Sequence, residues 1–196
     1  MLLKNTFDVP HPVDAVWEFF EDIPQVAACL PGAELTEVID EDDYKGRVAV
    51  GLGPVKLRFN GVAHITERDA AAKRLVLDAQ GADEKGRGQA SLKLVAQLTP
   101  TSTGTRVDLD QDLDLSGAAA QYGRGMIADV TATLMGQFAT NMQRRIEAKQ
   151  RGDDPDQVEN VVTVGGFGLG VKALQLALMR VFRRFFLPYQ RPEEAL

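Results

Sequence analysis

The residue types that most often carry out catalysis are scarce in this chain. Its 196 residues contain two histidines, His11 and His64, and a single cysteine, Cys29. His11 lies between two prolines and His64 has the outward strand parity of Arg58, so neither is placed as a catalytic base. We expect Cys29 to be a small buried residue, because nothing around it in sequence would lower its pKa. No nucleophile–base pair, disulfide or metal-binding spacing is evident, which predicts a non-enzyme without catalytic or metal-binding residues.

Gln111 is the polar residue that departs from its surroundings. Residues 107–115 alternate between aspartates and mostly leucines, and Gln111 has the parity of Leu109 and Leu113. It should therefore point inward, where a carboxamide needs protein partners or a ligand carbonyl or hydroxyl. The alternatives are a bulge that turns Gln111 outward, or a bond to helix backbone. Tyr122 is a second candidate, with its hydroxyl either at a cavity mouth or simply packed.

These residues must be positioned by strands in the middle of the chain and one long helix after them. Residues 3–9 predict a strand, and 13–20 and 23–30 two short helices. Period-two alternation and turn signals then predict strands over 34–39, 45–52, 55–67, 74–81, 88–98 and 105–115. Short connections favour an antiparallel meander. Residues 118–149 predict the long helix, with an apolar stripe that includes Ile127.

This order predicts an α+β helix-grip fold, in which a curved antiparallel sheet is closed by the long helix. Because twisted strands curl, a single helix across the concave face leaves a hollow. Strand parity and the helix stripe assign its lining, with solid packing of the same side chains as the alternative. The candidate ligand-binding residues are Leu57, Phe59, Leu92, Leu94, Leu109, Gln111, Leu113, Tyr122, Met126, Val130, Leu134 and Phe138.

Several short stretches carry a family resemblance. They are VAACLPGA at 26–33, GPVK at 53–56, GVA at 61–63, GRGQA at 86–90, GTRV at 104–107 and AQYGRGMI at 120–127. Together they resemble the carbon monoxide dehydrogenase G-subunit family of the START-like, SRPBCC-type superfamily, over roughly residues 1–150. The resemblance implies a deep apolar cavity and no common catalytic set. It also implies an accessory role beside a molybdenum hydroxylase, in attaching that enzyme to the membrane.

Charge divides the chain into a body and a tail. The formal charge is −6, yet residues 164–196 carry +3, which leaves −9 for the rest and argues against nucleic acid as a partner. We expect a START-like domain at 1–149, a flexible linker at 150–163 and a cationic amphipathic helix at 164–196. Its predicted membrane-binding residues are Phe167, Leu174, Leu178, Arg180, Phe182, Arg183, Arg184, Phe185 and Phe186. Docking on a partner protein or on the chain's own body are the alternatives for this helix.

The expected function is that of a non-catalytic carrier on the cytoplasmic face of the cell membrane, since no signal peptide is evident. Its partners would be the membrane, a molybdenum hydroxylase complex and a lipophilic small molecule. An isoprenoid quinone is the candidate ligand, because it would connect a redox enzyme to the respiratory chain. Two other hypotheses remain: an aromatase- or cyclase-type enzyme acting on an apolar substrate, and a purely structural membrane recruiter.

Overall fold

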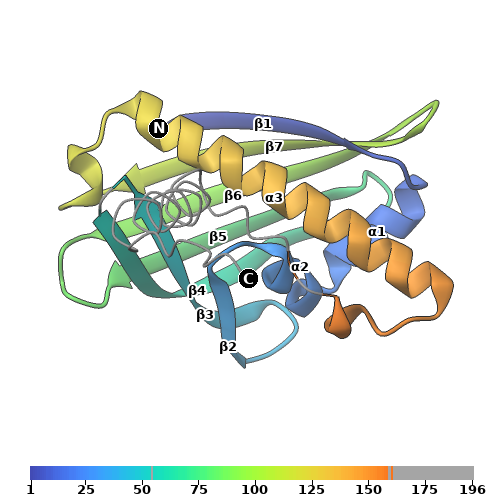
Figure 1. Ribbon diagram of the computed structural model, residues 1–196, viewed down its shortest axis with the longest axis horizontal. Helices are drawn as coiled ribbons and strands as arrows, with labels where there is room; N and C mark the ends of the chain where they lie inside the picture. The colour runs from blue at the N-terminus through green and yellow to red at the C-terminus, as the bar shows by residue number, and fades with distance from the viewer. Residues whose placement is uncertain (54, 159, 161–196) are drawn as a thin grey trace, which may run out of the picture. The chain divides into compact units, whose positions relative to one another are not determined.

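The computed structural model describes residues 1–53, 55–158 and 160 (Figure 1). The residues predicted to bind membrane lie outside this range. In chain order the elements are β1 (Leu2–Val9), α1 (Val13–Glu21), α2 (Ile23–Cys29), β2 (Ala33–Val38), β3 (Asp43–Leu52), β4 (Val55–Asp69), β5 (Arg74–Asp83), β6 (Gln89–Thr101), β7 (Gly104–Leu115), the short 3-10 helix η1 (Ala119–Gln121), α3 (Arg124–Arg151) and the short 3-10 helix η2 (Pro155–Gln157).

The seven strands form one antiparallel sheet in the order β1-β7-β6-β5-β4-β3-β2. Apart from β1, each strand pairs with its sequence neighbour, so the predicted meander is confirmed. The strand boundaries lie within three residues of the prediction. Figure 1 shows the sheet curving around α3, which crosses its concave side, with α1 and α2 near one end. The helix-grip arrangement is therefore present, because period-two alternation gives each strand one apolar face to bury.

A row of three glycines lets the middle of the sheet bend. Gly46 pairs with Gly61, and Gly61 pairs with Gly81, so the three lie side by side on β3, β4 and β5. A Cβ on Gly61 would overlap the carbonyl oxygen of Gln80, and one on Gly46 would lie 2.9 Å from that of Glu34. Glycine inside a strand commonly marks such a bend or close approach. The row also leaves the concave face without side chains at this point.

Helix α3 begins later than predicted. Residues 118–123 do not belong to it, because the Ala118 amide donates to the Arg87 carbonyl at 2.7 Å and η1 follows. Gly123 is extended, with φ −63° and ψ 151°, and is the N-cap rather than an interior residue. The helix ends at Gly152, whose φ of 82° is the left-handed conformation that glycine favours.

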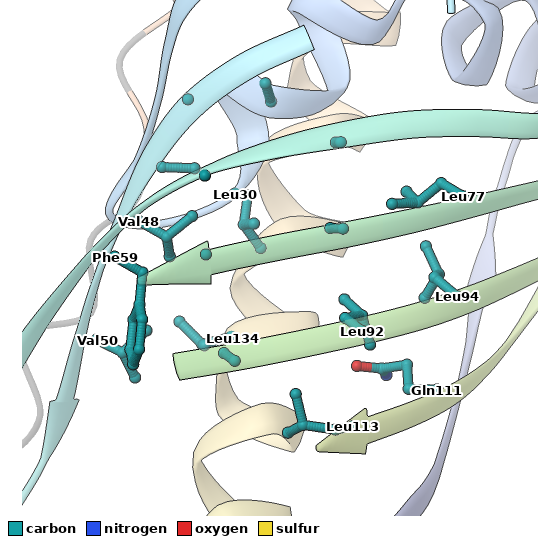
Figure 2. Close-up of a pocket in the computed structure, with 18 of the residues that line it drawn as sticks. Leu30, Val48, Val50, Phe59, Leu77, Leu92, Leu94, Gln111, Leu113 and Leu134 are labelled. Carbon is teal, nitrogen blue, oxygen red and sulfur yellow. The ribbon is translucent and has the colours of Figure 1, made fainter. Parts of the chain in front are cut away.

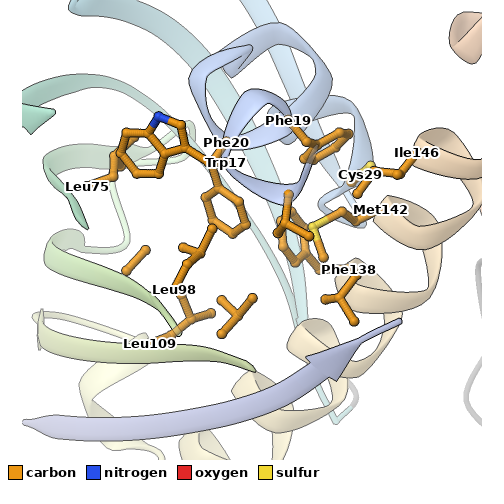
Figure 3. Packing of buried hydrophobic residues seen from close by; sticks show 14 of the residues in the cluster. Trp17, Phe19, Phe20, Cys29, Leu75, Leu98, Leu109, Phe138, Met142 and Ile146 are labelled. Carbon is orange, nitrogen blue, oxygen red and sulfur yellow. The ribbon is translucent and has the colours of Figure 1, made fainter. Parts of the chain in front are cut away.

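Buried apolar residues form two clusters. The larger lies among α1, the C-terminal half of α3 and the adjacent strands, and includes Trp17, Phe20, Leu98 and Phe138 (Figure 3). Phe138 makes edge-to-face contacts with Phe7 and Phe20, with ring centroids 6.1 and 6.3 Å apart. The smaller cluster contains Leu3, Leu52, Leu57, Ala119 and Ile127. A space remains between the two clusters.

The first residues of the expected linker belong to the body. Helix α3 continues through Arg151, and η2 follows it. Asp156 accepts hydrogen bonds from Gln25 at 2.8 Å and from the buried Arg145 at 3.2 Å. Asn160 donates to the Ala28 carbonyl at 2.6 Å. The predicted boundary at residue 150 was too early, because the polar sequence that indicated a linker supplies side chains that bond to α2 and α3.

Candidate ligand-binding cavity

The space between the two clusters is a cavity of about 450 Å³. Its walls come from every described helix and strand except β1 and η2, and most of the residues that line it are apolar. Figure 2 shows Leu30, which follows α2, together with Val48 of β3 and Leu134 of α3 around the same hollow. The prediction of a hollow is therefore favoured over solid packing.

Ten of the twelve predicted ligand-binding residues line this cavity, although their ligand-binding role stays a prediction. The ten are Leu57, Phe59, Leu92, Leu94, Leu109, Gln111, Leu113, Val130, Leu134 and Phe138. Met126 does not, because it is 42% exposed on the first turn of α3. Tyr122 does not either, because it lies before the helix and packs against the smaller cluster. The late start of α3 accounts for the difference at Tyr122.

The sequence prediction missed several walls of the cavity. Side chains from β3 and β5 line it, including Val48, Val50, Leu77 and Ala79. Their period-two parity could have identified them. The glycine row was also missed, and there the cavity reaches the backbone of β3, β4 and β5. Isolated glycines within strands were a signal for it, but only the strand register shows that the three align.

Gln111 lies where its parity predicted. It is 6% exposed, lines the cavity and donates from Nε2 to Asn5 Oδ1 on β1 at 2.9 Å. Figure 2 shows its carboxamide beside Leu92, Leu94 and Leu113, with the oxygen pointing into the pocket. Within the described part of the chain, Asn5 is the one hydrogen-bond partner found for this side chain. A polar group is thus present on a mostly apolar wall.

Two other polar side chains of the wall have their hydroxyl protons committed to protein atoms. The Tyr44 hydroxyl donates to the Glu41 carbonyl at 2.5 Å and accepts from Arg68 at 3.3 Å. The Thr131 hydroxyl donates to the Ile127 carbonyl at 2.9 Å. Gln111 is consequently better placed than either to hydrogen-bond a guest molecule.

Acid–base chemistry has little support among the described residues. No group of three or more histidine, cysteine or acidic side chains could hold a metal ion within that part of the chain. Burial raises the pKa of Cys29 to about 12, although Arg145 opposes this shift, so the thiol is not a nucleophile. His11 is buried and lies 3.3 Å from Gln150, and His64 is exposed beside Asp43. Neither histidine lines the cavity.

Within residues 1–53, 55–158 and 160, no helix is long and apolar enough to span a membrane.

The cavity lies wholly within a stretch that matches a known family. The sequence model of the G subunit of carbon monoxide dehydrogenase (CoxG) matches residues 6–147, which include all the residues that line the hollow. No curated protein sequence matches the chain.

Several solved structures share the fold. A conserved protein from Geobacillus kaustophilus has a TM-score of 0.68 at 23% identity, over 76% of this chain and 97% of its own. A protein from Thermus thermophilus has a TM-score of 0.56 at 16% identity, over 76% and 99%. The ZhuI aromatase/cyclase from Streptomyces sp. R1128 has a TM-score of 0.53 at 17% identity, over 76% and 97%. At these identities the similarity shows a shared fold alone.

Proposed function

Because the chain belongs to the carbon monoxide dehydrogenase G-subunit family, we propose that it is a non-catalytic accessory protein that holds a lipophilic molecule in its cavity. The observation that carries this proposal is the apolar hollow of about 450 Å³ under α3. This volume lies within the range of small-molecule sites, which are mostly apolar with a few placed polar groups. Gln111 supplies such a group.

The ligand we propose is an isoprenoid quinone. The leucines and valines of the walls suit an apolar ring and prenyl chain, and the Gln111 carboxamide suits a ring oxygen. The family name supports a redox enzyme as the partner. A quinone held beside a molybdenum hydroxylase of the carbon monoxide dehydrogenase type would accept its electrons and pass them to the respiratory chain.

Attachment to the cytoplasmic membrane face is the second part of the proposal. It is supported by the sequence of residues 164–196, where phenylalanines and leucines alternate at helical spacing with arginines. Each basic residue near an anionic surface contributes about 1 kcal/mol. A carrier at the membrane surface would have direct access to a ligand that dissolves in lipid.

The carrier function is tested by extracting the protein purified from its native host and analysing the extract by mass spectrometry. Two variants provide a matched comparison. Ala79→Phe places a ring in the cavity. Ala82 lies on the same strand but is exposed outside the cavity, so Ala82→Phe leaves the hollow unfilled. We expect a quinone from the wild type and from Ala82→Phe, and much less from Ala79→Phe. Recovery of no lipid from the wild type, under conditions that preserve its fold, would refute the carrier function.

Membrane attachment is tested separately by flotation with liposomes. The full chain should float with anionic vesicles and less with neutral ones, and a chain that ends at residue 163 should remain at the bottom. Equal flotation of the two chains would remove the tail from the proposal while leaving the cavity untouched.

A further inference from the structure

The Asn5–Gln111 pair has an arrangement that apolar packing does not explain. Both side chains project toward the concave face, from β1 and β7, and Gln111 is more than nine-tenths buried. One hydrogen of Gln111 Nε2 is used by Asn5 at 2.9 Å, while its oxygen faces the hollow. This oxygen has no protein hydrogen bond in the described chain and remains reachable from the hollow. A ligand that fills the hollow displaces water from it, so a ligand that supplies a donor would be favoured.

Two carboxamides bonded to each other can reverse together. Each has an oxygen that accepts and an NH2 group that donates two hydrogen bonds. If both turn by half a rotation, Asn5 Nδ2 donates to Gln111 Oε1, and Gln111 Nε2 then faces the hollow. Their mutual hydrogen bond is kept in either arrangement. The cavity therefore gains an acceptor in one state and a donor in the other, without exposing a charge.

We propose that the Gln111 carboxamide, turned by its pairing with Asn5, recognises both the hydroxyl and the carbonyl forms of one lipophilic ligand. A ligand hydroxyl donates to Gln111 Oε1 in the first state, and a ligand carbonyl accepts from Gln111 Nε2 in the second. This inference rests on the proposed function and specifies its chemistry. A carrier of a molecule that alternates between a ring carbonyl and a ring hydroxyl would then bind both forms with similar affinity.

Three probes of similar shape test the proposal on the full chain by isothermal titration calorimetry. They are 2-methylnaphthalene, 2-methyl-1-naphthol and 2-methyl-1,4-naphthoquinone, which present no polar group, a hydroxyl and carbonyls. Gln111→Met removes the carboxamide at similar length. We expect this variant to lower the affinities for the naphthol and the quinone about threefold to tenfold, which is the effect of losing one hydrogen bond. The affinity for the hydrocarbon should stay unchanged. As a control, Leu113→Met at the next inward position of β7 should change the affinities for all three probes by the same factor.

Asn5→Asp tests the reversal itself. An ionised carboxylate only accepts, so it holds Gln111 with Nε2 toward β1 and Oε1 toward the hollow. We expect the naphthol to bind as before and the quinone to bind at least threefold more weakly. In the wild type, the side-chain NH2 signals of Gln111 should shift with the quinone and not with the naphthol, which checks the same point without a variant.

The outcomes separate this inference from the proposed function. If the wild type binds none of the three probes, the carrier function fails. If it binds all three and Gln111→Met weakens them equally or not at all, recognition by Gln111 is refuted while the carrier function stands. If Asn5→Asp lowers the affinities for naphthol and quinone by the same factor, and the NH2 signals respond alike to both, the paired reversal is refuted.

Discussion

A comparison of two leucines on strand β6 tests whether the hollow is open in the folded protein. Leu92 and Leu98 have the same inward parity and the same side chain. Leu92 lines the cavity and is half-buried, whereas Leu98 is 2% exposed within the larger cluster. The changes Leu92→Ala and Leu98→Ala therefore remove identical atoms from two different surroundings.

The expected costs follow from these surroundings. Leu98→Ala leaves a void in a close-packed region and should lower the free energy of unfolding by about 3 kcal/mol. Leu92 already borders empty space, so its truncation enlarges the existing hollow rather than opening a new one. Burying a whole leucine stabilises by about 1.5–3 kcal/mol, and half of that contribution is about 1 kcal/mol. The difference of about 2 kcal/mol corresponds to about thirtyfold in the unfolding equilibrium.

Urea denaturation of both variants, followed by circular dichroism at constant pH, measures these costs. The two changes should affect ligand affinity in the opposite order. The half-buried Leu92 contacts the hollow, so Leu92→Ala should alter the affinity for an apolar probe, whereas Leu98→Ala should leave it unchanged. Equal losses of stability at the two positions would mean that the space around Leu92 is closed, and the argument for a ligand cavity would fail.

Three further predictions concern other parts of the fold. Gly61→Ala should destabilise the protein more than Gly81→Ala. A Cβ at residue 61 would overlap a carbonyl oxygen, whereas the nearest atom to a Cβ at residue 81 is 3.2 Å away. The midpoints of thermal unfolding of the two variants measure this difference. The Arg87 guanidinium and three backbone amides hold the pKa of Asp83 well below its usual range. The contribution of Asp83 to the free energy of unfolding is therefore complete above about pH 4 and is lost as the pH falls toward the folded pKa. Asp83→Asn should therefore lower stability at neutral pH, and its difference from the wild type should shrink in acid titrations. The native Cys29 thiol, with a pKa of about 12, should react with Ellman's reagent at pH 8 only as the chain unfolds, so equal rates with and without urea would contradict its burial.

Local pattern was sufficient to predict the sheet and most of the candidate site. Alternation in β7 placed Leu109, Gln111 and Leu113 on the concave face, and the structure has them there. This succeeded because a one-residue change of register would expose every leucine of the strand, so the sequence tolerates only one parity. The partner of Gln111 could not be predicted in this way, because Asn5 is distant in sequence and meets it only through the pairing of β1 with β7.

The failures occurred where long-range contacts outweighed local preference. Alanines at 118–120 favour a helix by propensity, yet Ala118 is bonded to Arg87 and the helix begins at Arg124. Residues 153–156, three aspartates and a proline, have the composition of a linker, yet the buried Arg145 provides a partner for Asp156. In each case the deciding group is distant in sequence or buried by tertiary packing.

The distribution of burial along α3 separates two requirements within one helix. Seven of its eight buried residues lie from Phe138 onward, while Val130 and Leu134 are half-buried over the hollow. The C-terminal half thus secures the fold, and the preceding turns set how much room is left beneath them. Replacements at Val130 and Leu134 could therefore resize the compartment for a longer or shorter guest at little cost in stability, so new ligand preferences can be engineered, or evolve, without redesigning the sheet.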